Sequence, residues 1–302
     1  MDNMDNKEAR SPHDPLLGQI FKNFRKHKGF TQQKAAGTIV SMSQISNFEA
    51  GKSTPILENF IALLHNINVS LSEFESAYNH ALSSKDLLLY DTKVTQALIN
   101  GSTTQIYTII KQIENEIKAS PVRLKYRLDK VAAEAGLASL DPSYQIPAHD
   151  IELLKDYLAH TTEWGLYDIR LLKRCFHLLG VIKLSKIVQS LLNPTQANYK
   201  LSFLQSDIIH TLFDIIHYYF DKNLLQDADE LISYLEKIEI NEHLMFEKLT
   251  LVYVRAELSY RGGRTVALET MKQCESALEL SGCFNTARVA EQEILAYEKE
   301  TK

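Results

Sequence analysis

Basic side chains that could bind phosphate are concentrated near the start of the chain. Residues 16–53 carry six basic side chains and one acidic side chain, Glu49, although the formal net charge of the whole chain is −5. The six are Lys22, Arg25, Lys26, Lys28, Lys34 and Lys52. Nucleic-acid binding depends on cations that neutralise phosphates at the contact face. The segment therefore predicts a nucleic-acid-binding surface, and charge alone leaves a lysine-rich surface helix as the alternative.

Residues with catalytic or metal-binding potential form only weak sets. His210, Asp214 and His217 would share one helix face, but a bundle metal site needs ligands on a facing helix, and we find no second set. Cys175 and His177 lie two residues apart and point to different faces. No phosphate-binding loop, dinucleotide fingerprint or HExxH motif is present. We therefore expect no metal, no cofactor and no enzymatic activity.

The composition predicts a helical protein. The 302 residues include only 11 Gly and 7 Pro, too few for the many turns of a β-sandwich or barrel. The mean hydropathy is −0.20, and no 18-residue apolar stretch or secretory signal is present, so we expect no membrane segment. Three scattered Cys fit neither a disulfide framework nor a zinc cluster, which favours a cytoplasmic location.

The basic segment reads as five short helices. Apolar residues recur at three-and-four spacing in each, and the predicted ranges are 16–29, 31–37, 42–51, 56–67 and 71–82. Gly29 can end the first helix in a left-handed conformation, while Thr31 and Ser41 can cap the second and third. Ala35 is small where two helices must cross closely.

The stretches KGFTQQKAA, VSMSQISNFEAGKSTP and ENFIALLHNINVSLSEF resemble the helix-turn-helix of phage-type repressors. In that family the second helix of the motif enters the DNA major groove. The resemblance implies that Met42, Ser43, Ser46 and Asn47 face base edges, that Gln44 braces the interface, and that Gln32 and Lys52 contact phosphate. Gln33 and Lys34 complete the expected DNA-binding set. Such motifs also serve as protein-interaction modules, which is the alternative.

The same resemblance implies that Arg25 and Glu49 form a buried structural ion pair. Arg25 is therefore not expected to contact phosphate. The helix predicted to enter the groove carries no Arg or Lys between Ser41 and Ala50, so the common arginine–guanine contact is not available to it. We expect modest intrinsic specificity, which dimerisation and DNA shape would supplement.

The remaining chain predicts a run of helical hairpins. Helices are expected near 84–100, 103–119, 121–138, 148–161, 165–179, 182–192, 199–221, 225–238, 241–261, 264–281 and 284–300. Pairs of about 35 to 45 residues are similar to degenerate tetratricopeptide units, as in EKLTLVYVRAELSYRGGRTVALETMKQCESALELSG. The predicted fold is all-α: a five-helix helix-turn-helix domain followed by a right-handed superhelix of tetratricopeptide-like hairpins, whose concave face suits an extended peptide.

This combination resembles the Rgg/GadR/MutR group of regulators, through SQISNFEAG, EWGLYDIRLL, LLQDADELISYLEKI and ALETMKQCESALELSG. The resemblance implies a cytoplasmic, homodimeric transcriptional regulator that binds promoter DNA and a short signalling peptide pheromone, with RNA polymerase as a further candidate partner. The expected domains are a disordered tail (1–15), a DNA-binding domain (16–82) and a peptide-binding and dimerisation domain (83–302). Two alternatives stay open: the repeat domain docks a protein partner, or the protein is a ligand-independent repressor.

An apolar peptide with a free carboxylate needs aromatic surface and an arginine fork. Candidate peptide-binding residues on the first helices of the pairs are Trp164, Tyr167, Arg170, Arg174, Tyr218, Tyr253 and Arg255. Arg170 follows Tyr167 by three residues and shares its helix face, whereas Tyr253 and Arg255 are two apart and lie on different faces. Aromatic residues at helical spacing are also typical packing residues, so each assignment competes with a structural one.

Overall fold

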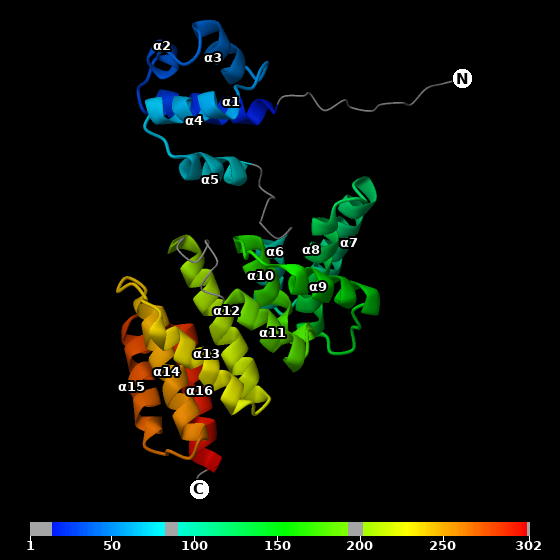
Figure 1. The fold of residues 1–302 in the computed structure, drawn as a ribbon, viewed down its shortest axis with the longest axis vertical. Helices are drawn as coiled ribbons and strands as arrows, with labels where there is room; N and C mark the ends of the chain where they lie inside the picture. Colours follow the sequence, from blue (N-terminus) through cyan, green and yellow to red (C-terminus); the bar gives the residue numbers. More distant parts are fainter. Residues whose placement is uncertain (1–13, 82–89, 193–201, 301–302) are drawn as a thin grey trace, which may run out of the picture. The chain divides into compact units, whose positions relative to one another are not determined.

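The computed structural model describes residues 14–81, 90–192 and 202–300. The chain divides into two compact units, an N-terminal unit (Met1–Asp86) and a C-terminal unit (Leu87–Lys302) (Figure 1). All regular elements within the described ranges are helices, which confirms the predicted all-α class. The expected domain boundary between residues 82 and 83 lies outside the described residues.

The N-terminal unit has five helices at the predicted places. They are α1 (Pro15–His27), α2 (Gln32–Ala36), α3 (Met42–Glu49), α4 (Leu57–Asn66) and α5 (Leu71–Ala81). The Thr31 hydroxyl accepts a hydrogen bond from the Lys34 amide at 3.1 Å and so caps α2. Asp14 caps α1 and Pro15 is its first residue, so the helix begins at the last residue of the expected tail, 1–15. Residues 1–13 lie outside the described residues.

One close helix crossing holds α1 against α3. A Cβ atom at Gly18 would lie 1.8 Å from the carbonyl oxygen of Phe48, so only glycine fits there. Beneath the crossing, Phe21 and Phe48 pack with ring centroids 5.4 Å apart in the core of the unit. Ala35 is fully buried on α2 in the same core, as expected of a small residue at a crossing. The position of α3 therefore depends on a tight fit to α1.

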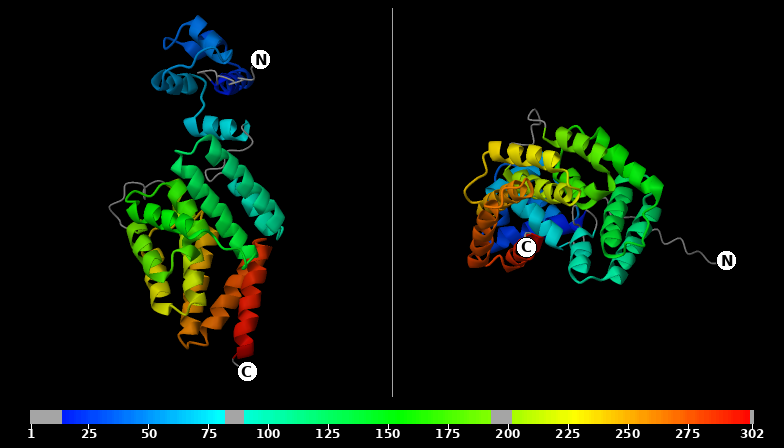
Figure 2. Two further views of the ribbon diagram at one scale, coloured as in Figure 1. Left: turned by 90° about the vertical axis from the view of Figure 1, so that its right-hand side faces the viewer. Right: turned by 90° about the horizontal axis from the view of Figure 1, so that it is seen from below.

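The C-terminal unit consists of stacked helical hairpins. Its elements are α6 (Asp91–Ile99), α7 (Thr103–Ala119), α8 (Leu124–Leu140), α9 (Ala148–His160), α10 (Leu166–Cys175), a 3₁₀ turn η1 (Phe176–Leu178), α11 (Val181–Leu191), α12 (Ser202–Asp221), α13 (Leu225–Lys237), α14 (Met245–Arg261), α15 (Ala267–Leu280) and α16 (Phe284–Glu300). Sequence neighbours pack on each other from α6 to α9 and from α12 to α16, whereas α10 packs on α8 and α12, and α11 packs on α9. The helices follow an arc from α6 to α16 (Figure 2, right). The predicted starts near 84 and 199 lie outside the described residues.

Helix α8 is a wall shared by two hydrophobic cores. Every residue from Val131 to Leu137 is buried. Ala133 and Leu137 pack with α6 and α7, whereas Val131 and Ala135 belong to the larger core that extends to α16. Small side chains on α8 therefore let helices approach it from both sides. Among the described helices, none is long and apolar enough to cross a membrane.

Candidate functional site

The helix-turn-helix formed by α2 and α3 presents the predicted reading side chains to solvent. Ile45 and Phe48 turn one face of α3 into the core, which leaves the opposite face free. The exposed side chains of that face and of its surroundings are Gln33, Lys34, Met42, Ser43, Ser46, Asn47 and Lys52. A convex, exposed helix of this kind can enter a major groove.

Two predicted contact residues are engaged within the unit. Gln44 closes a capping box with Ser41: the Gln44 side-chain oxygen accepts from the Ser41 amide at 2.8 Å, and the Ser41 hydroxyl accepts from the Gln44 amide at 3.2 Å. The Gln32 amide nitrogen donates to Glu49 at 2.9 Å. Both side chains thus shape the motif, and Gln32 is only partly exposed.

A buried bidentate ion pair joins α1 to α3. Arg25 Nε lies 2.5 Å from Glu49 Oε1, and Arg25 Nη2 lies 2.8 Å from Glu49 Oε2. The Arg25 and Glu49 side chains are only 8% and 2% exposed. Arg25 Nη1 also donates to the Phe30 carbonyl at 2.7 Å, which fixes the loop before α2. The pair therefore holds the orientation of α3 and is not available to DNA.

The environment of Glu49 favours its ionised form. Burial alone raises the pKa of this carboxyl, but hydrogen bonds from Arg25 and Gln32, together with the Arg25 charge, outweigh it. The pKa of Glu49 is therefore held below its ordinary value of 4.5. The ion pair persists throughout the neutral range.

In the C-terminal unit, two predicted peptide-binding residues are core residues. Trp164 is 1% exposed and packs in the large hydrophobic core. Tyr253 is 5% exposed, and its hydroxyl donates to Glu293 at 2.8 Å. Placing Trp164 on a groove surface is therefore wrong, because the stacked hairpins enclose it. Tyr253 lines a cavity between α12, α14, α15 and α16.

Three further candidates have structural partners. Arg255 binds Asp229 at 2.5 Å and Glu236 at 2.6 Å, and so links α14 to α13. The Tyr167 hydroxyl donates to Asp129 on α8 at 3.2 Å. The half-buried Tyr218 ring packs against Phe176, with centroids 5.6 Å apart. These contacts account for the three side chains without a ligand. The different directions of Tyr253 and Arg255 agree with their spacing.

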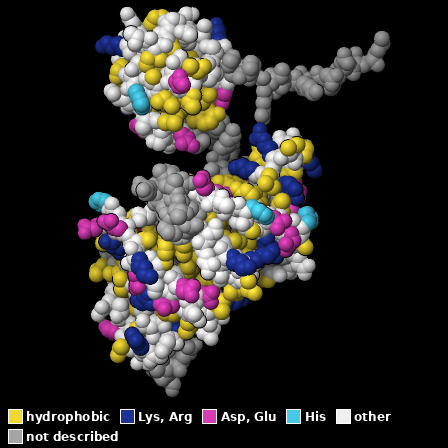
Figure 3. All heavy atoms as spheres, viewed as in Figure 1, with side chains coloured by type: hydrophobic (Ala, Val, Ile, Leu, Met, Phe, Trp, Pro, Cys, Tyr) yellow, Lys and Arg dark blue, Asp and Glu magenta, His cyan; other side chains and the backbone are white. Residues whose placement is uncertain are grey.

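Arg170 and Arg174, by contrast, line a cavity of about 550 Å³. The cavity lies between α6, α8, α10 and α12, and its polar lining residues include Asp91, Thr95, Ser139, Arg170, Lys173, Arg174, His177, Asp207 and Asp214. Burial lowers the pKa of His177 below its ordinary value, so its ring is neutral at pH 7. The cations all come from one turn of α10. In Figure 3, basic and acidic side chains intermingle over the visible face of this unit.

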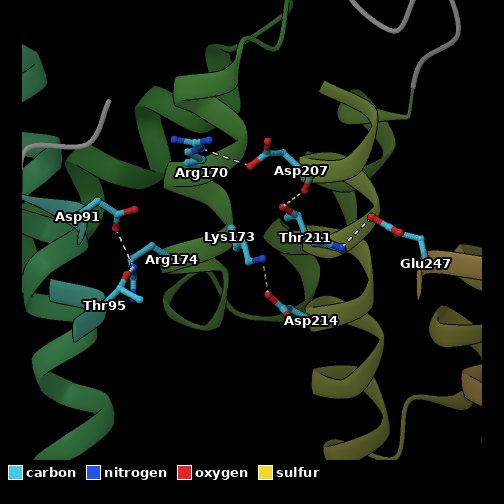
Figure 4. A network of polar contacts seen from close by, with 10 residues as sticks. Asp91, Thr95, Arg170, Lys173, Arg174, Asp207, Thr211, Asp214 and Glu247 are labelled. Carbon is cyan, nitrogen blue, oxygen red and sulfur yellow. Dashed lines mark hydrogen bonds and ion pairs between the residues drawn. The ribbon is translucent and has the colours of Figure 1, made fainter. Parts of the chain in front are cut away.

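Each cation of the α10 turn faces an aspartate across the cavity (Figure 4). Arg174 binds Asp91 at 2.7 Å and the Thr95 hydroxyl at 2.8 Å on α6. On the other side, α12 supplies Asp207, 3.3 Å from Arg170, and Asp214, 3.6 Å from Lys173. The α12 pairs are long and half-exposed, so each contributes little stability and can be exchanged for another carboxylate.

The C-terminal unit matches a known family. Residues 109–292 match the family described as HTH-type transcriptional regulator Rgg, C-terminal domain. The chain belongs to the Rgg family of transcriptional regulators. Residues 21–74 separately match the helix-turn-helix family. The motif α2–α3 is therefore the DNA-binding motif of an Rgg-family protein, as the resemblance implied.

Solved structures share the fold of this Rgg-family chain over nearly its whole length. A putative transcriptional regulator from Listeria monocytogenes EGD-e is 16% identical, with a TM-score of 0.81 and coverage of 95% of this chain and 98% of that one. The Streptococcus dysgalactiae SHP pheromone receptor Rgg2 is 18% identical, with a TM-score of 0.74 and coverage of 93% and 99%. PrgX, in a PrgX/cCF10 complex, is 15% identical, with a TM-score of 0.69 and coverage of 93% and 99%.

Of the residues that line the α10 cavity, the sequence of this Rgg-family chain predicts only Arg170 and Arg174 as peptide-binding residues. Lys173 was predictable, because positions 170, 173 and 174 have the i, i+3, i+4 spacing of residues on one helix face. The sequence pattern indicates Asp214 only as a weak metal-ligand candidate beside His210 and His217. In the structure these three side chains face Lys173, Glu247 and Glu257 respectively. Among the described residues, no cluster of three or more His, Cys, Asp or Glu side chains could hold a metal ion.

Proposed function

We propose that this Rgg-family protein is a cytoplasmic dimer that binds promoter DNA through α3 and a short peptide through the cavity between α10 and α12. In this proposal, residues 16–82 form the DNA-binding domain, and residues 83–302 form the peptide-binding and dimerisation domain. The observation that carries the peptide assignment is the α10 turn, which places Arg170, Lys173 and Arg174 in one cavity. Two structural relatives support it by their names, a pheromone receptor and a protein in complex with cCF10.

The cavity suits the carboxylate end of a peptide. Its 550 Å³ lies within the range of about 300–1,000 Å³ that is usual for ligand pockets. Arginine can hold a carboxylate through two parallel hydrogen bonds, and a ligand carboxylate could replace Asp207 at Arg170.

The ion pairs also offer a route for regulation. Arg174 connects α10 to α6, while Arg170 and Lys173 connect it to α12. A ligand that replaces one aspartate changes which helices are tied together. It can shift the protein between two states only if it binds them with different affinity. We propose that such a shift alters the spacing of the two DNA-binding units or their contact with RNA polymerase.

Replacing Arg170 tests the peptide site. In Arg170→Ala we expect the affinity for a peptide encoded beside this gene to fall by roughly 10- to 100-fold, because a hydrogen bond to a charged group is lost. Arg255→Ala is the matched control, since Arg255 also binds two carboxylates but lies outside this cavity. Isothermal titration calorimetry measures both variants, with the free peptide and its C-terminal amide.

Carboxylate recognition by α10 would be contradicted if Arg170→Ala and Arg255→Ala lost the same peptide affinity. It would also be contradicted if the free peptide and its C-terminal amide bound equally well. If no short peptide binds while a protein partner does, the repeat unit serves protein docking instead. Unchanged promoter control in every condition would identify a ligand-independent repressor.

On the DNA side, α3 and α2 should contribute differently. Asn47→Ala should weaken binding to the preferred duplex by about 1–3 kcal/mol and relax selectivity at one base pair, because a side-chain amide can form hydrogen bonds with a base edge. Lys34→Ala should weaken binding to all duplexes alike. It should also reduce the slope of log K against log salt concentration by about 1, because one phosphate contact is lost. Fluorescence anisotropy with duplexes selected from a random library, at several salt concentrations, distinguishes the two. Selectivity that survives in Asn47→Ala but not in Lys34→Ala would reverse the assignment.

A further inference from the structure

A further cavity of about 260 Å³ lies between α12, α14, α15 and α16. Phe220, Leu278 and Val289 supply apolar wall, and the carboxylates of Glu257 and Glu293 lie in the same lining. None of its lining residues belongs to the cavity at α10. It is a separate site with acidic and apolar surface.

Glu257 is a buried carboxylate with one oxygen left unsatisfied. Its Oε1 accepts hydrogen bonds from the Tyr297 hydroxyl at 2.7 Å and from Arg261 Nε at 2.9 Å. Its Oε2 is buried and has no hydrogen-bond partner within the described part of the chain. The Nδ1 atom of His217 lies 3.9 Å away, beyond hydrogen-bond distance. A buried carboxylate oxygen without a donor is rare and calls for a missing partner.

Glu293 adds a second carboxylate to the same cavity. It accepts a hydrogen bond from the Tyr253 hydroxyl at 2.8 Å. Burial, together with the negative charge of Glu257, nevertheless raises the pKa of Glu293 above its ordinary value. Arg261 is the guanidinium that lines this cavity, and it is already engaged with Glu257. Asp221 also lines the cavity, so the lining that the structure describes holds three carboxyl groups and one guanidinium.

We propose that this cavity binds a compact organic cation, an ammonium or guanidinium group on a short alkyl chain. The cationic head lies against Glu257 and Glu293, where it donates hydrogen bonds to the unsatisfied oxygen. The alkyl chain lies against Phe220, Leu278 and Val289. A volume of 260 Å³ is small for a peptide and suits a ligand below the usual range of about 300–1,000 Å³. The site goes beyond the proposed peptide site and does not depend on it.

The test compares a cation with its neutral isostere on the full-length protein. Calorimetry with n-butylguanidinium and n-butylurea should show saturable binding of the cation alone. Glu293→Gln should weaken that binding by roughly 10- to 100-fold, because it removes a charged acceptor. Glu257→Gln should weaken it similarly, and circular dichroism shows whether this variant remains folded. Within the described residues, the hydrogen bond of the Glu293 side chain is the one from Tyr253, so the Glu293 variant keeps the test decisive if Glu257→Gln unfolds.

Glu247→Gln is the matched control. Glu247 is also a buried α14 carboxylate that faces a histidine of α12, His210 at 3.2 Å, but it does not line this cavity. Its variant should bind the cation like the parent protein, and so should Arg170→Ala. The proposal is overturned if the cation does not bind, if the urea binds equally, or if Glu293→Gln binds as well as Glu247→Gln.

The cation could be a free small molecule or an arginine side chain of a peptide, and a second titration separates these sources. A capped tripeptide with a central arginine offers the same guanidinium on a backbone. Binding of n-butylguanidinium but not of the tripeptide supports a free small molecule, whereas comparable binding of both supports a side chain. Peptide recognition at α10 can fail without affecting either result, because the two cavities share no lining residue.

Discussion

Glu49→Ala should destabilise the N-terminal unit by about 3–5 kcal/mol. The substitution leaves the Arg25 guanidinium, only 8% exposed, without its carboxylate partner. Arg25 keeps the Phe30 carbonyl, which carries no full charge to balance it. Hydrogen–deuterium exchange measured by mass spectrometry should show lost protection in residues 14–81, with little change in residues 90–300. DNA binding should fall with it, because α3 loses its tie to α1.

The matched control for Glu49→Ala is a double variant, Arg25→Met with Glu49→Leu. It removes both charges and keeps the volume, so it should be far more stable than the single variant. If Glu49→Ala costs less than about 1 kcal/mol, the ion pair does not organise the unit, because that is the scale of an exposed pair.

Acid should reproduce part of this effect in the unmodified protein. Because the pKa of Glu49 is lowered in the fold, its contribution to stability is fully present above the ordinary pKa of 4.5. It is lost as the pH falls through the lowered folded-state pKa. The double variant should lack this portion of the acid sensitivity, which urea unfolding at several pH values can measure.

Lys130→Met should destabilise the C-terminal unit by a similar amount, about 3–5 kcal/mol. Lys130 Nζ lies 2.6 Å from Glu134 and 3.1 Å from Asp150, whose side chains are 1% and 8% exposed. Burial alone lowers the pKa of Lys130, but these two carboxylates outweigh it and raise the pKa above 10.5, so the amine stays charged. Its removal leaves the buried carboxylates of Glu134 and Asp150 without the ammonium group that they share where α8 packs on α9.

The single tryptophan, Trp164, makes this measurement specific, because it lies in the core of the C-terminal unit. Its fluorescence should report earlier urea unfolding in Lys130→Met. Lys155→Met is the control, since Lys155 pairs with Glu152, which is 57% exposed, and should change stability by less than about 1 kcal/mol. Equal effects of the two variants would show that burial does not decide the cost.

The helix-turn-helix was predictable because its signals are local. Thr31 and Ser41 cap α2 and α3 within three residues of the amides that they accept from, so the sequence shows them directly. Gln32 was less predictable, since its partner Glu49 comes 17 residues later and on another helix. A side chain that falls at a DNA-contacting position can therefore belong to the interior network instead.

The α10 cavity was less predictable because its partners are distant in sequence. Arg174 and Asp91 are 83 residues apart, and only the packing of α10 and of α6 against α8 brings them together. Trp164 was assigned to a groove because helical spacing does not distinguish a surface groove from the contact between stacked hairpins. In the structure Trp164 lies in the loop between α9 and α10 and not on the first helix of a pair.

The absence of Lys and Arg from α3 has a consequence for the time the protein spends on DNA. In the proposed DNA complex, binding to random DNA rests on exposed lysines outside this helix, such as Lys34 and Lys52, and these contacts are the same at every site. In the same proposed complex, the operator adds mainly amide, hydroxyl and methyl contacts from α3, which lengthen the residence time on DNA only moderately. We expect short residence times on the operator and rapid exchange between DNA sites. Promoter occupancy in such a protein follows a change in ligand level with little delay.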